Sequence, residues 1–171
     1  MPFLDANLLL ADIASGDEKR RLEAANVISE LQVDTDIDVS VFVASLRSAN
    51  DDVLFWSEIA LRRLGERGGA AIPMLLSLLK REELFLRQSA LKALVAVGPK
   101  DACARAAVFL AFSDSSALVR REALQACIDL PEHSTDELAA IAAMATDSDE
   151  AVSRWSEIAL RNIRIREEER A

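Results

Sequence analysis

The chain has 171 residues, of which 51% are hydrophobic, 29% are charged and 5% are aromatic, and its formal net charge is −9 at pH 7. This composition excludes a disordered tail and a small disulfide scaffold, and the length suffices for one domain with a continuous core. Five Gly, four Pro and no Tyr are too few for the turns and strand faces of a sandwich or barrel. The net negative charge argues against nucleic acid or an anionic membrane as a partner, since Lys and Arg carry phosphate binding.

The first residues of the chain and its two cysteines predict the cellular compartment of the protein. The first fifteen residues carry Asp5 and Asp12 and no basic stretch, unlike a secretory signal peptide. No apolar run approaches the ~18 residues of a membrane span. Cys103 and Cys127 fall in apolar helical patterns and form no CxxC pair, so we expect two buried free thiols. We therefore expect a cytoplasmic protein with no membrane association.

Taken in chain order, ten apolar segments with helical spacing follow one another in pairs. The heptapeptide WSEIALR occurs at 56–62 and again at 155–161, and alignment on its alanine finds one such alanine in the second helix of every pair: Ala24, Ala60, Ala90, Ala123 and Ala159. Their separations of 36, 30, 33 and 36 residues are typical of a solenoid. The pattern predicts a single domain, 1–171, whose helix pairs span approximately 3–31, 36–65, 69–97, 101–130 and 135–166.

Polar and glycine residues mark the predicted helix ends. Three positions have the spacing of a capping box: Ser15 with Glu18, Ser134 with Glu137, and Asp147 with Glu150. The G-x-x-G-G at 65–69 follows a helix and precedes no Lys-Ser/Thr, so we interpret it as a helix stop and not as a phosphate-binding loop.

Over nearly all of the chain this pattern resembles the HEAT repeat family, and two segments match it best. IPMLLSLL at 72–79 is similar to the family's first helix, and DSSALVRREALQAC at 114–127 is similar to its turn and second helix, with Asp114 and Arg120 at the family's Asp and Arg positions. The resemblance implies an all-α fold, a right-handed α-α superhelix of about five HEAT-like helix pairs whose second helices line the concave surface. Other pairs depart from the pattern, since Ser57 and Ser156 replace the arginine and Arg81 stands where an acid is expected. A continuous Asp/Arg ladder is therefore not predicted.

Residue types that perform catalysis are scarce. His133 is the only histidine in the sequence and follows Pro131 in a predicted turn, where we expect a solvated ring. Trp56 and Trp155 align with Leu86 and Val119, which favours packing over stacking on a ligand. We predict a non-enzymatic protein with no catalytic residue, cofactor or metal.

Basic residues recur on the second helices. Two positions after each alanine come Asn26, Arg62, Lys92, Gln125 and Arg161, and the rows two and three positions before it bring the total to seven basic against two acidic residues. These rows predict contacts for an acidic peptide, an acidic patch of a partner or a phosphate-bearing ligand: Arg62, Lys92, Arg121, Gln125, Arg161, Arg87 and Arg120. The alternative interpretation is a solvated face, on which these side chains cover apolar helix sides and pair with nearby acids.

The function we predict is a protein–protein interaction scaffold that binds a partner along the second helices. One alternative is a nucleic-acid-binding or DNA-glycosylase-like HEAT protein with a local basic groove, although the isoelectric point of about 4.7 counts against it. A second is a bilin-lyase-like or other small-molecule role, for which the sequence offers no dedicated polar pocket. A homodimer through an uncovered solenoid end is a further alternative.

Overall fold

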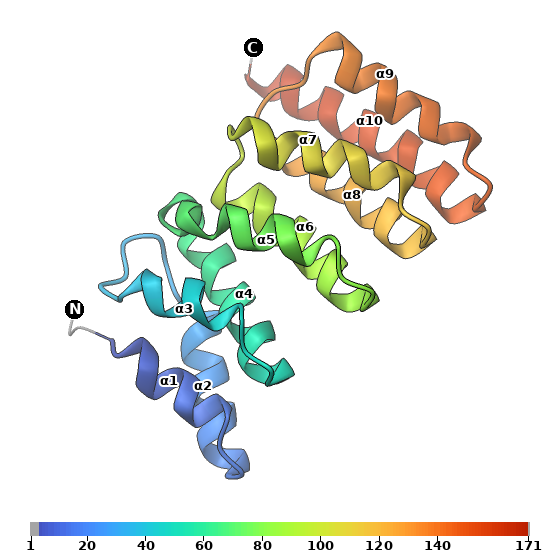
Figure 1. Ribbon diagram of the computed structural model, residues 1–171. Coiled ribbons are helices and arrows are strands. Elements are labelled where there is room, and N and C mark those ends of the chain that lie inside the picture. Colours follow the sequence, from blue (N-terminus) through green and yellow to red (C-terminus); the bar gives the residue numbers. More distant parts are fainter. Residues whose placement is uncertain (1–3, 171) are drawn as a thin grey trace.

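The computed structural model describes residues 4–170, and these form ten α-helices joined by loops and 3-10 turns (Figure 1). Consecutive helices pair as α1 (Ala6–Ile13) with α2 (Glu18–Ser29), α3 (Val39–Ser45) with α4 (Asp51–Leu64), α5 (Ile72–Leu78) with α6 (Leu84–Val97), α7 (Ala102–Leu110) with α8 (Ala117–Asp129), and α9 (Thr135–Ala143) with α10 (Glu150–Arg170). The 3-10 turns are η1 (Gly65–Ala71), η2 (Ala111–Ser113) and η3 (Met144–Thr146). Between residues 4 and 170 there is no strand, only an isolated bridge between Leu4 and Ile37. The predicted all-α solenoid is confirmed; the first predicted pair begins at residue 3, which lies outside the described residues.

The second helices form one continuous layer. Each of α2, α4, α6 and α8 packs against the second helix of the next pair, and the first helices lie together on the other side (Figure 1). The repeated alanine of every second helix is at most 3% exposed. An alanine has no side chain beyond Cβ, so the neighbouring helix can approach closely at each of these points.

The core fills the space between the two layers and consists of an N-terminal and a C-terminal cluster, both of which include residues of α6. Trp56 packs against the N-terminal core cluster and Trp155 against the C-terminal one, so both tryptophans serve the packing expected of them. Cys127 is fully buried, and burial raises the pKa of its thiol to about 12. The expectation of a second buried thiol is wrong, because Cys103 lies near the start of α7 on its exposed side.

Only one of the three expected capping boxes forms. Ser134 and Glu137 cap α9 reciprocally, as predicted. Asp17 caps α2 and Asp149 caps the start of α10, because each stands directly before the first helical residue. The helix stop at 65–69 is confirmed, since Gly65 ends α4 with φ +58°, a conformation that favours glycine.

An arginine of η1 holds the loop between α2 and α3. Arg67 Nη1 donates to the carbonyl oxygens of Val33 at 2.8 Å and Thr35 at 2.6 Å, and its Nη2 donates to that of Ile37 at 3.1 Å. These carbonyls have no helical partners of their own, so one exposed side chain takes the place of a regular turn.

Two arginine–aspartate rungs tie the last three pairs together. Arg87 of α6 binds both carboxylate oxygens of Asp114, with Nε–Oδ2 at 2.8 Å. Arg120 of α8 binds Asp147 in the same way, also with Nε–Oδ2 at 2.8 Å. At the equivalent place in α4, the Ser57 hydroxyl bonds to the Val53 carbonyl of its own helix. The rungs are therefore a feature of the C-terminal half.

We predict that Arg120→Ala lowers the free energy of unfolding at pH 7 by about 2 to 4 kcal/mol, because the Asp147 carboxylate, only 9% exposed, loses its partner. The hydrogen bond from Arg120 holds the pKa of Asp147 below its usual range. The rung therefore contributes fully above the ordinary Asp pKa of about 3.9 and is lost as the pH falls through the lowered value, so the deficit should shrink in acid.

Urea denaturation followed by circular dichroism measures this difference. Arg154→Ala is the control, because Arg154 pairs with Glu150 on the surface with side chains 73% and 79% exposed, and it should cost less than about 1 kcal/mol. Equal losses for the two variants would show that the rung adds nothing to the solenoid.

Candidate partner-binding groove

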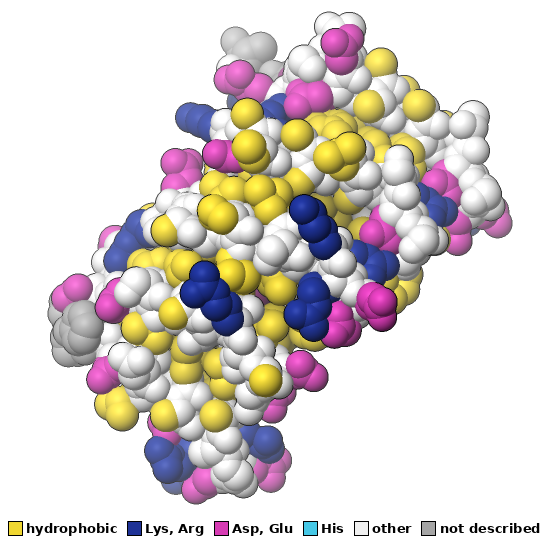
Figure 2. All heavy atoms as spheres, in the orientation of Figure 1, with side chains coloured by type: hydrophobic (Ala, Val, Ile, Leu, Met, Phe, Trp, Pro, Cys, Tyr) yellow, Lys and Arg dark blue, Asp and Glu magenta, His cyan; other side chains and the backbone are white. Residues whose placement is uncertain are grey.

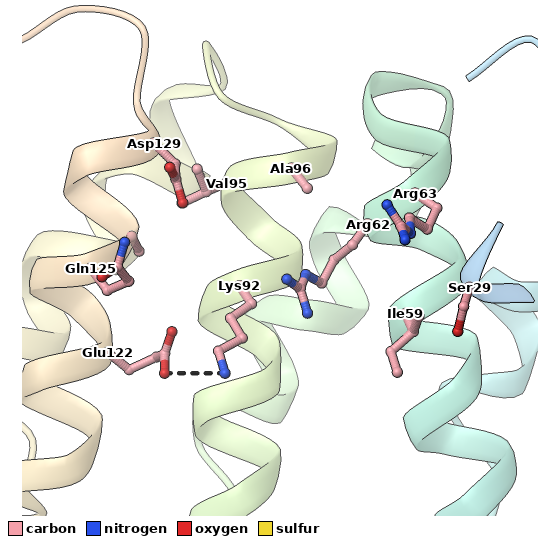
Figure 3. A pocket seen from close by; sticks show the side chains of 11 residues that line it. Ser29, Ile59, Arg62, Arg63, Lys92, Val95, Ala96, Glu122, Gln125 and Asp129 are labelled. Carbon is pink, nitrogen blue, oxygen red and sulfur yellow. Dashed lines mark ion pairs between the residues drawn. The ribbon is translucent and has the colours of Figure 1, made fainter. Parts of the chain in front are cut away.

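A groove of about 740 Å³ crosses the second helices from α2 to α8 (Figure 3). Its wall is made of basic, acidic and small side chains: Ser29, Ile59, Arg62, Arg63, Lys92, Val95, Ala96, Glu122, Gln125, Ala126 and Asp129. Four helices contribute because the alanine contacts hold them in one layer, with equivalent positions side by side.

The groove carries three exposed cations, Arg62, Arg63 and Lys92. Figure 3 shows Arg62 extending from α4 toward α6, where Lys92 meets Glu122 of α8 with Nζ–Oε2 at 3.3 Å. The side chains of Arg62 and Lys92 are 43% and 42% exposed. Their carboxylate partners are much less exposed, Glu58 at 2% and Glu122 at 12%, so a ligand that takes over these cations must compete with both acids.

A carboxylate lies buried beside these cations. Glu58 is 2% exposed, and its Oε1 lies 3.5 Å from Arg62 Nε on the next turn of α4. Within residues 4–170 this oxygen receives no hydrogen bond. Burial raises the pKa of Glu58 to about 7, although the charges of Arg62 and Lys92 oppose this rise and Glu122 adds to it.

The repeated heptapeptide shows that position in the stack creates this environment. Glu157 occupies the same place in WSEIALR as Glu58, yet it is exposed. The difference arises because α6 covers α4 on that side, whereas no second helix follows α10 in the described chain.

The structure brings only some of the predicted contact residues together. Arg62, Lys92 and Gln125 line the groove. Arg121 and Arg161 lie outside its lining, the first half-buried and the second exposed. The remaining two, Arg87 and Arg120, are held in the rungs with side chains only 12% and 13% exposed.

Three charged groove residues escaped the sequence interpretation: Arg63, Glu122 and Asp129. They stand three positions after, one before and six after the aligned alanine. On α8, Glu122 lies three residues before Gln125 and Asp129 lies four residues after it, so all three share one helix face. Extending the predicted row by one turn in each direction would have found these two acids.

Between residues 4 and 170, the other groups considered for chemistry are either engaged in contacts or not found. The expectation of a solvated His133 is wrong, because its ring is half-buried and Nε2 lies 2.8 Å from the Cys127 carbonyl oxygen at the end of α8. The described part of the chain has no group of three or more His, Cys, Asp or Glu side chains placed to hold a metal ion. No helix within 4–170 has the length and apolar character needed to cross a bilayer.

Two apolar features lie elsewhere on the surface. Phe55, Phe85 and Leu118, five positions before the aligned alanines, are 39%, 38% and 43% exposed and form an apolar row at the start of α4, α6 and α8. On the first-helix face, hydrophobic side chains form bands between the helices (Figure 2). One band holds a groove of about 540 Å³ between α5 and α7, lined mainly by apolar side chains such as Leu79 and Leu110.

Comparison with solved structures gives the fold class. A designed armadillo repeat protein in complex with the peptide (KR)4 superposes with a TM-score of 0.60 at 15% identity, over 91% of this chain and 80% of that one. The HEAT-like repeats protein of the archaeon Thermococcus onnurineus NA1 gives a TM-score of 0.51 at 16% identity, over 91% and 69%. The fold is an armadillo/HEAT-like helical solenoid. No protein family model and no curated protein matches the sequence.

We predict that Glu58 makes the solenoid less stable as the pH rises. Its folded pKa is raised, so between the ordinary Glu value of about 4.3 and about 7 the folded state keeps a proton that the unfolded state has lost. The free energy of unfolding should fall across this window by up to about 3 kcal/mol and level off above it.

Urea titrations of Glu58→Gln and wild type at pH 5 and pH 8 measure this contribution. As the pH rises, the free energy of unfolding of Glu58→Gln should increase relative to that of wild type. Glu157→Gln makes the same change in the exposed copy of the heptapeptide, and its free energy of unfolding should change with pH as that of wild type does. A constant difference between Glu58→Gln and wild type would contradict the raised pKa.

Proposed function

We propose that this protein is a non-enzymatic interaction scaffold that binds an acidic, extended segment of a partner protein in the groove across α2 to α8. The observation that carries the proposal is the cluster of three cations, Arg62, Arg63 and Lys92, exposed in one 740 Å³ groove on rigid helices. Preformed charged groups on packed helices lose little entropy on binding, which favours recognition over chemistry.

The groove has the size of a short peptide. Neighbouring helices in contact lie about 8 to 10 Å apart, so four second helices span roughly 27 Å. An extended chain rises about 3.4 Å per residue, so about eight residues would cross the groove. The same row continues to Arg161 on α10, which we propose, with Arg121, as a flanking contact for a longer segment. We do not propose Arg87 and Arg120 as contacts, because their side chains already pair with Asp114 and Asp147.

The charges in the groove favour a peptide over a nucleic acid. Glu122 and Asp129 line the same wall and would repel a continuous phosphate backbone. A peptide can place its carboxylates selectively, beside Arg62, Arg63 and Lys92, and meet the apolar row of Phe55 and Phe85 with other residues.

Loss of the three groove cations should weaken this binding. We predict that R62A/R63A/K92A weakens binding of a rhodamine-labelled peptide of six aspartates at least tenfold at pH 6 and low salt, as judged from about 1 kcal/mol or more per charged contact. Fluorescence anisotropy gives the affinity, and circular dichroism checks that the helices remain.

The control K19A/R81A/R154A removes the same charge from exposed ion pairs outside the groove. It should bind the peptide as wild type does. If both triple variants lose affinity equally, the attraction comes from overall charge and the groove is not the site. If wild type prefers a labelled single-stranded DNA of eight nucleotides to the peptide, the nucleic-acid alternative replaces the proposal.

A further inference from the structure

A buried carboxylate beside the groove competes for two of the cations that we assign to the ligand. Glu58 is buried at 2% exposure and pairs with Arg62 at 3.5 Å, but the pair makes no hydrogen bond and Oε1 has no donor in the described chain. A buried carboxylate without a donor is poorly stabilised in its charged form. An ionised Glu58 nevertheless attracts Arg62 and Lys92, two of the three cations that we assign to the acidic ligand.

We propose that Glu58 determines the charge selectivity of the groove: protonation of its carboxyl releases Arg62 and Lys92 to bind an acidic segment, and ionisation reclaims them. This inference rests on the proposed function, because the acidic segment is its ligand. Glu58 acts through the two cations and is a positioning residue.

A proton on Glu58 changes the charge beside the groove by one unit. The lining holds the cations Arg62, Arg63 and Lys92 and the acids Glu122 and Asp129, and Asp129 also pairs with Arg166 of α10 at 3.4 Å. Ionised Glu58 offsets part of the positive charge of Arg62 and Lys92, and protonated Glu58 does not. Since unit charges a few ångströms apart interact strongly where solvent is partly excluded, this proton changes the affinity for an acidic ligand.

Three helices supply the charges that act on Glu58: Arg62 on α4 itself, Lys92 on α6 and Glu122 on α8. Burial outweighs the two cations and places the pKa of Glu58 at about 7. The carboxylates of an arriving ligand add negative charge, which raises this value further, so binding must take up protons near neutral pH.

The experiment measures binding of the rhodamine-labelled six-aspartate peptide at pH 6 and pH 8 and constant ionic strength. Asp ionises near 3.9, so the peptide keeps its charge across this range. Wild type should bind about fivefold more tightly at pH 6 than at pH 8, as expected if the bound ligand raises the pKa of Glu58 by about one unit. Glu58→Gln, permanently neutral, should bind at pH 8 as tightly as wild type does at pH 6.

Glu157→Gln is the matched control, because it makes the same change in the exposed copy of WSEIALR and should keep the wild-type pH dependence. An equal pH dependence in wild type and Glu58→Gln would overturn the role of Glu58 and leave the groove as a binding site. Failure of wild type to bind the peptide at either pH would instead overturn the proposed function itself.

Calorimetry of the unmutated protein gives a second test that does not depend on how a variant folds. At pH 7, titration of the peptide in two buffers of different ionisation enthalpy should show a net uptake of a few tenths of a proton per complex. Binding without proton uptake would contradict the proposal.

Discussion

The close approach of neighbouring second helices is the constraint on which the other features of this structure depend. The aligned alanines, all at most 3% exposed, allow five second helices to pack as one layer. Because equivalent positions then lie side by side, residues some thirty positions apart in the chain line one groove, and Arg120 reaches Asp147 of the next pair. A larger side chain at these positions would separate the helices and with them the cations on their surface.

Burial gives the groove its electrostatic character. Arg62 and Lys92 remain nearly half exposed, whereas Glu58 on the same helix as Arg62 is covered by α6. The cations are therefore accessible to a ligand, and the buried carboxyl is the group whose pKa is raised to about 7. Glu58 is buried, whereas the cations beside it are exposed to solvent, and this burial raises the pKa of Glu58 toward neutral pH.

Periodic features of the sequence predicted the architecture well. The alanine spacing fixed the pairs because a 3.6-residue apolar stripe has few other ways to be buried, and Arg62, Lys92 and Gln125 share the groove because they share a helix position. The two WSEIALR copies show where this reasoning ends: Glu58 and Glu157 have identical neighbours in sequence, and only the next helix in space distinguishes them. Arg67 likewise sits in a glycine-rich turn with no local sign of the three carbonyls it binds.

We propose that an acidic segment binds across the second helices and not on the apolar first-helix face. A titration of isotopically labelled protein with the unlabelled six-aspartate peptide at pH 6, followed by amide chemical shifts, tests it most directly. We predict the largest shifts within the segments 59–63, 92–96 and 122–129, which hold the residues that line the groove on α4, α6 and α8. Largest shifts along α5 and α7, or shifts spread evenly over both faces, would contradict it.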